Sequence, residues 1–522
     1  MSRTMGTLMR GSVPLAVWWI LGIGVSLIIA LALPWHMDEF VMYKAYSCWS
    51  PLQQWNIYGE SCTTYPTTLG PIEFFRSYRY IGITSSLIIA PFALLLPYTW
   101  MPAVLGIGFL ALGAWGLQRG FRLPPAVIPA IMLVFPIAFA VIRDSGPVRL
   151  SFLVLCWSPV IVTAFLRTGH WRWVAVLSVS WAFAAEDKPF FAYLIPGITV
   201  FAVAGAIRQG LLPRNAAGWL RLVIAFGISA GVVLALLLAL QVPTGSYLSF
   251  LASDTPGRDP STLLPGALSG LFLLLDWAYS GHRISFNSLS NVTGDTWIES
   301  ITNRLPDLRS PRWIAGSLFT AMSIAAPVGL LALTLRWRQR INPAVLVCVA
   351  AALALFVGAV IPGSWAMHHF VFAQVPLAVA GALVLVGTAP RIVAALLTGG
   401  SLAAVLAIVA IPQQPYAGYE ANTALNVALS NADSSTVINC ADWGCYFPGT
   451  FTARDHIPVG FANTPQFAAQ LEQRARDAGV TVLHVCAFCE QRQVEEYFPN
   501  SQVTPVYVDG QYWRVFRVVP GT

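Results

Sequence analysis

The feature that most constrains this chain is a succession of apolar runs, most of them about 20 residues long. A helix needs roughly 20 apolar residues to cross the hydrocarbon core of a bilayer. The first run, 13–34, follows a short basic segment and has no small-residue cleavage site after it. We therefore expect a retained membrane helix rather than a signal peptide. Further runs occupy 80–97, 101–118, 126–142, 147–166, 172–185, 190–207, 217–241, 313–335, 342–361, 370–388 and 391–411.

The composition agrees with a chain that faces lipid. Hydrophobic residues make up 56% of the sequence and charged residues only 10%, whereas soluble domains carry roughly a quarter charged residues. The same composition excludes a disordered chain. The formal net charge of +7 comes mostly from short loops between apolar runs. We therefore expect it to orient the chain in a membrane, and we expect no nucleic-acid partner.

The connecting loops fall into two alternating sets that differ in charge. Cytoplasmic loops are enriched in arginine and lysine, so we expect the basic set inside and the other set outside. The basic set holds Arg119, Arg122, Arg167, Arg172, Arg208, Arg214, Arg221, Arg336, Arg338, Arg340 and Arg391. The other set holds Asp38, Glu39, Asp144, Glu186, Asp187, the 242–312 loop, His368 and His369.

This alternation works only if residues 80–118, which contain two apolar stretches, make one net crossing. Pro91 and Pro97 interrupt the first stretch, so we expect 80–97 to form a helix that lies on or dips into the outer leaflet. The result is about 11 transmembrane helices, with the N-terminus in the cytoplasm and the C-terminus outside. If 80–118 crossed twice, the Arg119–Arg122 loop would lie outside and every later element would be inverted.

From about Pro412 the sequence becomes polar and contains no further membrane run. Strands are expected at 436–439 and 480–485, and a closing hairpin at 503–519. A helix is expected at 464–478, with Thr464 as a possible N-cap and Gly479 at its end.

The fold class predicted is thus an all-α polytopic protein of the inner (plasma) membrane with a small extracytoplasmic α/β domain at its C-terminus. The membrane domain is expected over 1–412, with outer loops at 35–100 and 242–312. The tail domain is expected over 413–522.

Six of the eight cysteines fall in segments that we expect outside, where oxidation is permitted. The spacing leaves the pairing open, although Cys48–Cys62 and two bridges in the tail are natural pairs. The Cys-x4-Cys and Cys-x2-Cys spacings in the tail could also hold zinc. An oxidising compartment favours disulfides. The six are Cys48, Cys62, Cys440, Cys445, Cys486 and Cys489.

Four ionisable clusters lie near the lipid, where a charge is costly and its position is informative. Each also has a structural interpretation: the polar end of a span, a charged turn, an ion pair that caps two helices, or a pair of interfacial histidines. All four fall on the expected outer side. A transporter should instead carry polar residues near the midplane of several helices, so the pattern favours an enzyme that opens at the outer leaflet. The clusters are Asp38–Glu39; Arg143, Asp144 and Arg149; Glu186, Asp187 and Lys188; and His368–His369.

The segment His36-Met37-Asp38-Glu39-Phe40 follows the first span, and in this respect the layout resembles the GT-C glycosyltransferases. These integral membrane enzymes use lipid-linked sugars outside the cytoplasm and keep an acidic residue, often in an Asp-Glu pair, at this position. Residues 40–97 match their juxtamembrane helices, Asp144 matches an acid in the second outer loop, and 242–312 matches a large later loop. Lipid A aminoarabinose transferases, protein O-mannosyltransferases and bacterial arabinofuranosyltransferases share this plan. The acidic pair is the only sequence motif behind the resemblance.

The resemblance implies transfer of a single sugar from a polyprenyl-phosphate donor to a hydroxyl of a glycan, glycolipid or protein acceptor, with inversion. Asp38 would be the general base, and Glu39 or Asp144 would orient the acceptor or help to hold a divalent ion. No Asp-x-Asp motif occurs in the outer loops, so the need for magnesium or manganese stays open. The residues expected to bind the donor phosphate or substrate are Lys188 first, then Glu186, Asp187, Arg143, Arg149, His282, Arg283, His368 and His369.

Three other functions stay open. The first is a transporter or flippase of a lipid-linked or anionic solute. The second is a polymerase or ligase of surface polysaccharide, in which His282 and Arg283 would be central. A non-catalytic assembly subunit also survives if the acids are dispensable. The sequence does not identify the sugar, the acceptor or the lipid length.

Overall fold

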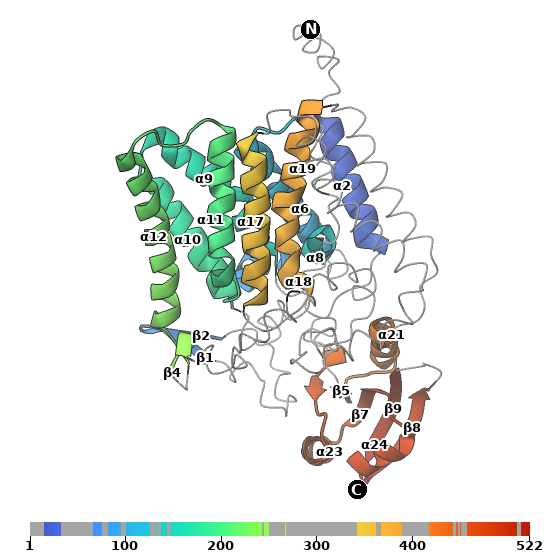
Figure 1. Cartoon of the computed structure of the whole chain (residues 1–522). Helices are drawn as coiled ribbons and strands as arrows, with labels where there is room; N and C mark the ends of the chain where they lie inside the picture. The colour runs from blue at the N-terminus through green and yellow to red at the C-terminus, as the bar shows by residue number, and fades with distance from the viewer. Residues whose placement is uncertain are drawn as a thin grey trace.

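The structure is a computed structural model in which a helical bundle is joined to a smaller sheet domain (Figure 1). Of the residues predicted to form the site, Asp38, Glu39, Arg143, Asp144, His282 and Arg283 lie outside the described part of the chain. The structure describes residues 15–32, 66–75, 82–95, 101–125, 132, 137–142, 148–242, 245–249, 267, 342–361, 367–388, 417–441, 445–446, 449, 457–508 and 513–521.

The bundle is built from helices that match most of the apolar runs in its described part. Five of them, α6, α9, α11, α12 and α17, are long and apolar enough to cross a membrane, so the chain is a multi-pass membrane protein. The runs at 313–335 and 391–411 lie outside the described residues, and the total of 11 spans stays a prediction. The helices are α2 Leu15–Ala32, α5 Thr84–Leu95, α6 Met101–Phe121, α8 Ile137–Ile142, α9 Arg149–Thr168, α10 Arg172–Asp187, α11 Phe191–Arg208, α12 Ala216–Ala239, α17 Pro343–Val360, α18 Met367–Phe370, the 3-10 turn η7 Val371–Ala373 and α19 Gln374–Thr388.

Glycines bring α6 and α9 into close contact. A Cβ added at Gly113 would lie 2.3 Å from the Phe152 ring, and one at Gly120 would lie 2.8 Å from the Cβ of Pro159. Small residues allow helix backbones to approach each other in a membrane, where van der Waals packing replaces the hydrophobic effect. Because the contacting residue numbers rise together, α6 and α9 run parallel.

This direction fixes the path of the chain through α5. The backbone N–H of Gly82 donates to the carbonyl of Asp187 at 2.7 Å, so α5 starts where α10 ends. Helix α6, which is parallel to α9 and antiparallel to α10, begins at that same end. Helices α5 and α6 thus start at the same end of the bundle, which agrees with one net crossing by residues 80–118. The structure describes α5 over 12 residues, and the chain from 96 to 100 lies outside the described part.

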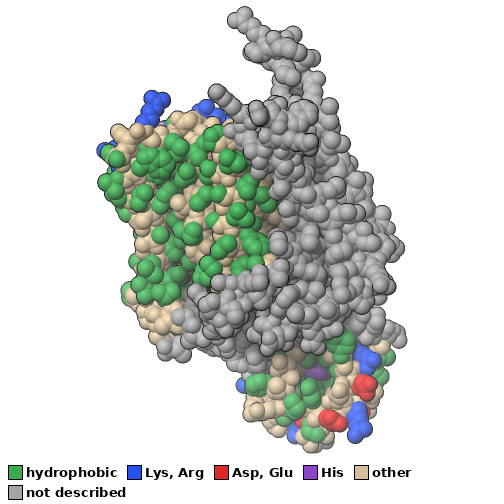
Figure 2. All heavy atoms as spheres, in the orientation of Figure 1, with side chains coloured by type: hydrophobic (Ala, Val, Ile, Leu, Met, Phe, Trp, Pro, Cys, Tyr) green, Lys and Arg blue, Asp and Glu red, His purple; other side chains and the backbone are tan. Residues whose placement is uncertain are grey.

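The two ends of the bundle differ in charge. The described arginines between helices gather at the end opposite the sheet domain, where Figure 2 shows basic side chains in blue. There Gln209 accepts a hydrogen bond from Arg167 and donates to the carbonyl of Gly120 at 2.6 Å. Glu186 and Asp187 lie at the other end, which we call the acidic end; the first we call the arginine end. The apolar face between them is exposed, notably along α12, as expected for contact with lipid (Figure 2).

A small antiparallel sheet lies at the acidic end (Figure 1). The resemblance implied juxtamembrane helices over 40–97, and the hairpin of this sheet within that range was not predicted. Thr68 in the hairpin pairs with Gln241, which directly follows α12, so the sheet ties two distant segments together. The strands are β1 Pro66–Leu69, β2 Ile72–Phe75, β3 Leu240–Val242 and β4 Gly245–Ser246.

The tail contains a five-stranded sheet of order β6-β5-β7-β9-β8. Strand β5 pairs in parallel with β6 and β7, and β9 pairs antiparallel with both β7 and β8. The predicted helix is confirmed: Thr464 accepts a hydrogen bond from the N–H of Phe467, and Gly479 ends the helix at φ 65°. The hairpin is confirmed as β8–β9. The elements are α21 Ala417–Ser430, β5 Thr436–Cys440, β6 Val459–Phe461, α23 Pro465–Ala478, β7 Thr481–Ala487, α24 Gln491–Tyr497, β8 Ser501–Tyr507 and β9 Trp513–Pro520.

The tail cysteines form two disulfides, Cys440–Cys445 and Cys486–Cys489. The prediction of two bridges in the tail is confirmed. In the described part of the chain, no group of three or more His, Cys, Asp or Glu side chains could hold a metal ion. Cys48 and Cys62 lie outside the described residues.

A buried histidine occupies the centre of the tail sheet. His484 on β7 lies beside Asn439 on β5, and the Asn439 amide nitrogen is 2.7 Å from Nδ1 of His484. An amide nitrogen can only donate, so Nδ1 accepts and the ring is neutral. Burial lowers the pKa of His484 from the usual 6.5 to about 4, because the charged ring would be desolvated.

We expect the tail domain to lose stability as the pH falls below about 6.5. The unfolded chain then takes up a proton on His484, whereas the folded chain does so only near pH 4. The loss should reach about 2 kcal/mol at pH 5. Pulse proteolysis of the full-length protein in urea and detergent, at pH 7 and pH 5, measures it. In His484→Gln this pH dependence should shrink, and an unchanged dependence would contradict the assignment.

Candidate functional site

Two buried carboxylates at the acidic end hold the start of α5. Glu186 and Asp187 are the last residues of α10, with 6% and 0% of their surface exposed. Glu186 accepts hydrogen bonds from the backbone N–H of Thr84 at 3.0 Å and from the Thr84 hydroxyl at 2.7 Å. Asp187 accepts from the backbone N–H of Ser85 at 2.8 Å and from its hydroxyl at 2.7 Å. We call these residues of α10 and α5 the carboxylate clamp.

The clamp follows from what a helix start requires. The first N–H groups of a helix have no partner within the helix, and the helix dipole places partial positive charge there. The two carboxylates satisfy these donors and offset that charge. Gly82 permits the approach, because a Cβ there would lie 2.0 Å from the carbonyl oxygen of Glu186. The hydrogen bonds thus give both acids a structural role, and substrate binding by them stays a prediction.

Lys188 and His369 come together through one aromatic ring. Lys188 is buried, and its Nζ lies 6.0 Å from the centroid of the Phe190 ring. The same ring stacks on the buried His369 ring, with 4.0 Å between the centroids and an angle of 18° between the planes. The structure therefore joins two predicted phosphate-binding residues that are far apart in the sequence.

Gln374, a short distance along the chain from His369, was not among the predicted site residues. Gln374 is the first residue of α19 and is 2% exposed. Neither its amide nitrogen nor its amide oxygen has a hydrogen-bond partner within the described part of the chain. Buried polar groups are normally paired, and an unpaired amide is costly. The sequence marks this residue only as a single glutamine within an apolar run. This amide can donate and accept, as recognition of a hydroxyl-rich ligand requires.

Arg149 also has structural contacts. It starts α9, is 1% exposed, and donates from Nε to the carbonyl of Val141 at 2.9 Å and from Nη2 to that of Ile142 at 2.7 Å. These carbonyls belong to the last two residues of α8, where a helix offers no N–H donor of its own to bond them. Since α8 packs against η7, Arg149 belongs to the same end of the bundle as His369.

The described acidic end thus contains Glu186, Asp187, Lys188, Arg149 and His369, together with Gln374. The side chain of His368 lies outside the described residues. A divalent ion stays an open expectation, because the acids of the first two outer loops, which would hold it, also lie outside the described part.

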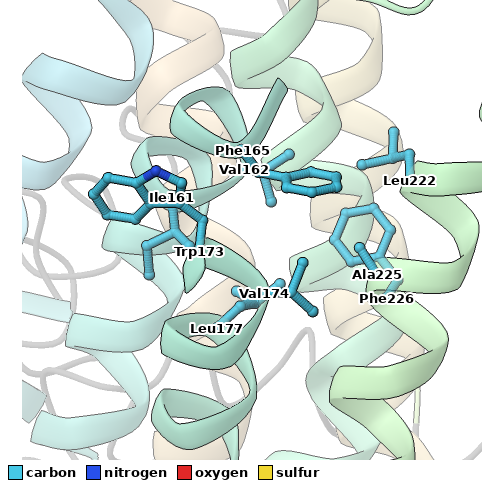
Figure 3. A pocket seen from close by; sticks show the side chains of 9 residues that line it. All are labelled: Ile161, Val162, Phe165, Trp173, Val174, Leu177, Leu222, Ala225 and Phe226. Carbon is cyan, nitrogen blue, oxygen red and sulfur yellow. The ribbon is translucent and has the colours of Figure 1, made fainter. Parts of the chain in front are cut away.

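A small apolar pocket lies between α9, α10 and α12, nearer the arginine end (Figure 3). Every residue that lines it is hydrophobic, so it offers packing surface and no groups for proton transfer or phosphate binding. It contributes nothing to the acidic end. Its lining consists of Ile161, Val162, Phe165, Trp173, Val174, Leu177, Leu222, Ala225 and Phe226.

Comparison with known proteins adds a likeness to solved structures. No protein-family model matches the chain, and no curated protein matches its sequence. Among solved structures, the chain is similar to the crystal structure of ArnT from Cupriavidus metallidurans in the apo state. The two are 15% identical with a TM-score of 0.40, over 96% of this chain and 97% of that chain. A likeness at this level does not establish a shared family, so the function has to be argued from the residues.

We expect Glu186→Gln to lower the free energy of unfolding by about 1–2 kcal/mol, because it weakens the charge that caps α5. Thermal unfolding of the purified protein in detergent measures the change. Glu496→Gln is the matched control, since Glu496 is exposed and forms only a surface ion pair with Arg492; such pairs contribute little. If Glu186→Gln kept full stability but lost substrate binding, Glu186 would be a ligand rather than a cap.

Proposed function

We propose that this chain is a membrane glycosyltransferase that moves one sugar from a polyprenyl-phosphate donor to an acceptor hydroxyl outside the cytoplasm, with inversion. The observation that carries the proposal is the convergence of Lys188, His369 and the unpaired Gln374 amide on the acidic end. Helix α2 runs toward this end (Figure 1). Asp38 follows its last residue, Ala32, by six residues, a reach of at most about 20 Å.

Each group has a task in the reaction. The acceptor oxygen attacks the anomeric carbon, the bond from that carbon to the phosphate oxygen breaks, and the polyprenyl phosphate leaves. Asp38 takes the acceptor proton as general base. Lys188 and His369 offer positive charge or N–H donors to the leaving phosphate, which a desolvated site makes more effective. Gln374 suits a sugar hydroxyl, because its amide can both donate and accept.

The proposed orientation places the arginine end in the cytoplasm and the acidic end with the tail outside. The positive-inside rule supports this choice. The two tail disulfides support it independently, because such bonds persist in oxidising compartments.

The interior of the described bundle is less suited to transport. Buried serines near its middle already have partners: Ser178 and Ser229 each donate to a carbonyl of their own helix, and their hydroxyls are 3.0 Å apart. Ser158 donates to the carbonyl of Val154. Ser26 on α2 is a buried serine whose hydroxyl has no partner in the described part of the chain. A transporter binds its substrate near the midplane between helices with several such groups, whereas the buried charged groups of the described bundle lie at the acidic end.

We expect Asp38→Asn to lower the transfer rate by a factor of about 10²–10⁴, because it removes the proton acceptor. Donor binding should be retained, because the phosphate is bound by other groups. Transfer by purified protein from radiolabelled polyprenyl-phosphate sugars, with donor binding measured in parallel, tests this. Glu39→Gln is the matched control and should have a smaller effect. Full activity in Asp38→Asn would remove Asp38 from the site, and loss of binding with it would point to transport or donor recognition instead.

A further inference from the structure

We propose that the Cys486–Cys489 disulfide in the tail is a thiol–disulfide exchange site for a protein dithiol outside the cytoplasm. Cys486 is the penultimate residue of β7, and Cys489 lies between the end of β7 and the start of α24. A Cys-x-x-Cys pair between a strand and a helix is the arrangement that disulfide oxidoreductases use. It lies at the carboxyl edge of the parallel strands, where open α/β sheets bind their ligands.

The second disulfide lies at the same edge and provides an internal comparison. Cys440 ends β5 and pairs in register with Val485 on β7. Cys440 and Cys445 are both fully buried, and Cys486 is 3% exposed. Cys489 is only partly buried. Cys489 is therefore the most exposed of the four cysteines and the best placed for attack by an incoming thiolate, which exchange requires.

The residue beside Cys489 is held in a conformation that suits a contact site. Phe488 is 69% exposed and has a φ of 55°. A bulky residue rarely adopts the left-handed region, and residues held there cluster at functional sites. The loop thus presents an aromatic ring to solvent immediately next to the accessible sulfur. A protein dithiol could bind this ring while its thiolate reaches Cys489.

A fixed positive charge accompanies the cysteines. Arg514 on β9 is the cross-strand neighbour of Cys486, and its Nη1 donates to the carbonyl of Cys489 at 2.8 Å. The guanidinium is therefore anchored to the loop that contains the disulfide. Positive charge near a cysteine stabilises its thiolate, and a more stable thiolate leaves faster in exchange.

Reduction should leave the domain folded. The two cysteines are only three residues apart in the sequence, and short loops gain least stability from a cross-link. Cys486 packs in the tail core with Val494 and Phe498, and those contacts do not require the bridge. The disulfide can therefore open and close as a reaction rather than as an unfolding event.

The exchange takes place in two steps. A thiolate of the partner dithiol attacks Sγ of Cys489, the bond between Cys489 and Cys486 breaks, and Cys486 leaves as a thiolate. The second partner thiol, after losing its proton, attacks the partner sulfur of the mixed disulfide and releases Cys489 as a thiolate. Two electrons pass from the dithiol to this chain, and the partner becomes a disulfide.

The test uses full-length protein in detergent with two probes: dithiothreitol, and a thioredoxin whose resolving cysteine is serine so that mixed disulfides are trapped. Alkylation and peptide mass spectrometry follow each cysteine over time. We expect dithiothreitol to reduce Cys486–Cys489 at least tenfold faster than Cys440–Cys445, and we expect the trapped thioredoxin on Cys489. Equal rates at the two bridges, or no adduct on Cys489, would overturn the proposal and leave a structural cross-link.

The arginine supplies a second test. Arg514→Gln should slow reduction of Cys486–Cys489 severalfold, because the leaving thiolate loses its nearby charge. Arg517→Gln is the matched control, being an exposed arginine on the same strand, and it should leave the rate unchanged. Equal rates in the two variants would remove Arg514 from the proposed site.

Discussion

The carboxylates of Glu186 and Asp187 take up the hydrogen-bond donors that begin α5, and the arrangement of the acidic end depends on this contact. It fixes the start of α5 against the end of α10, at the same end of the bundle where α6 and α9 begin. The next residue, Lys188, lies over the ring of Phe190, which in turn stacks on His369. A pair of buried charges that would be costly alone thus becomes the anchor of the candidate site.

Much of the bundle could be predicted because the signal for a membrane helix is local. The run expected at 217–241 is α12, Ala216–Ala239, and that at 342–361 is α17, Pro343–Val360. The small sheet could not be predicted, because Thr68 pairs with Gln241 far along the chain. In the tail, the helix beginning after Thr464 carries its own cap and was predictable from sequence, whereas the pairing order of the strands is not a local property.

The candidate site likewise combines features that the sequence predicts with contacts that it could not predict. The sequence indicates that the charges at 186–188, flanked by apolar residues, need partners or water, and the two acids do have partners. It could not say that the partners of the two acids are the N–H groups of α5, a segment about 100 residues earlier. Arg149 is a similar case, because its acceptors are the final carbonyls of α8. Gln374 was missed because one amide in an apolar run has no pattern; only its burial without a partner distinguishes it.

The most direct test of this account is a cryo-electron microscopy structure of the protein with a polyprenyl phosphate bound. The central claim is that the acidic end holds the donor. It predicts density for the phosphate next to Lys188 and His369, with the lipid chain leaving toward the bilayer between the helices. A phosphate bound among the arginines at the opposite end of the bundle would contradict the claim.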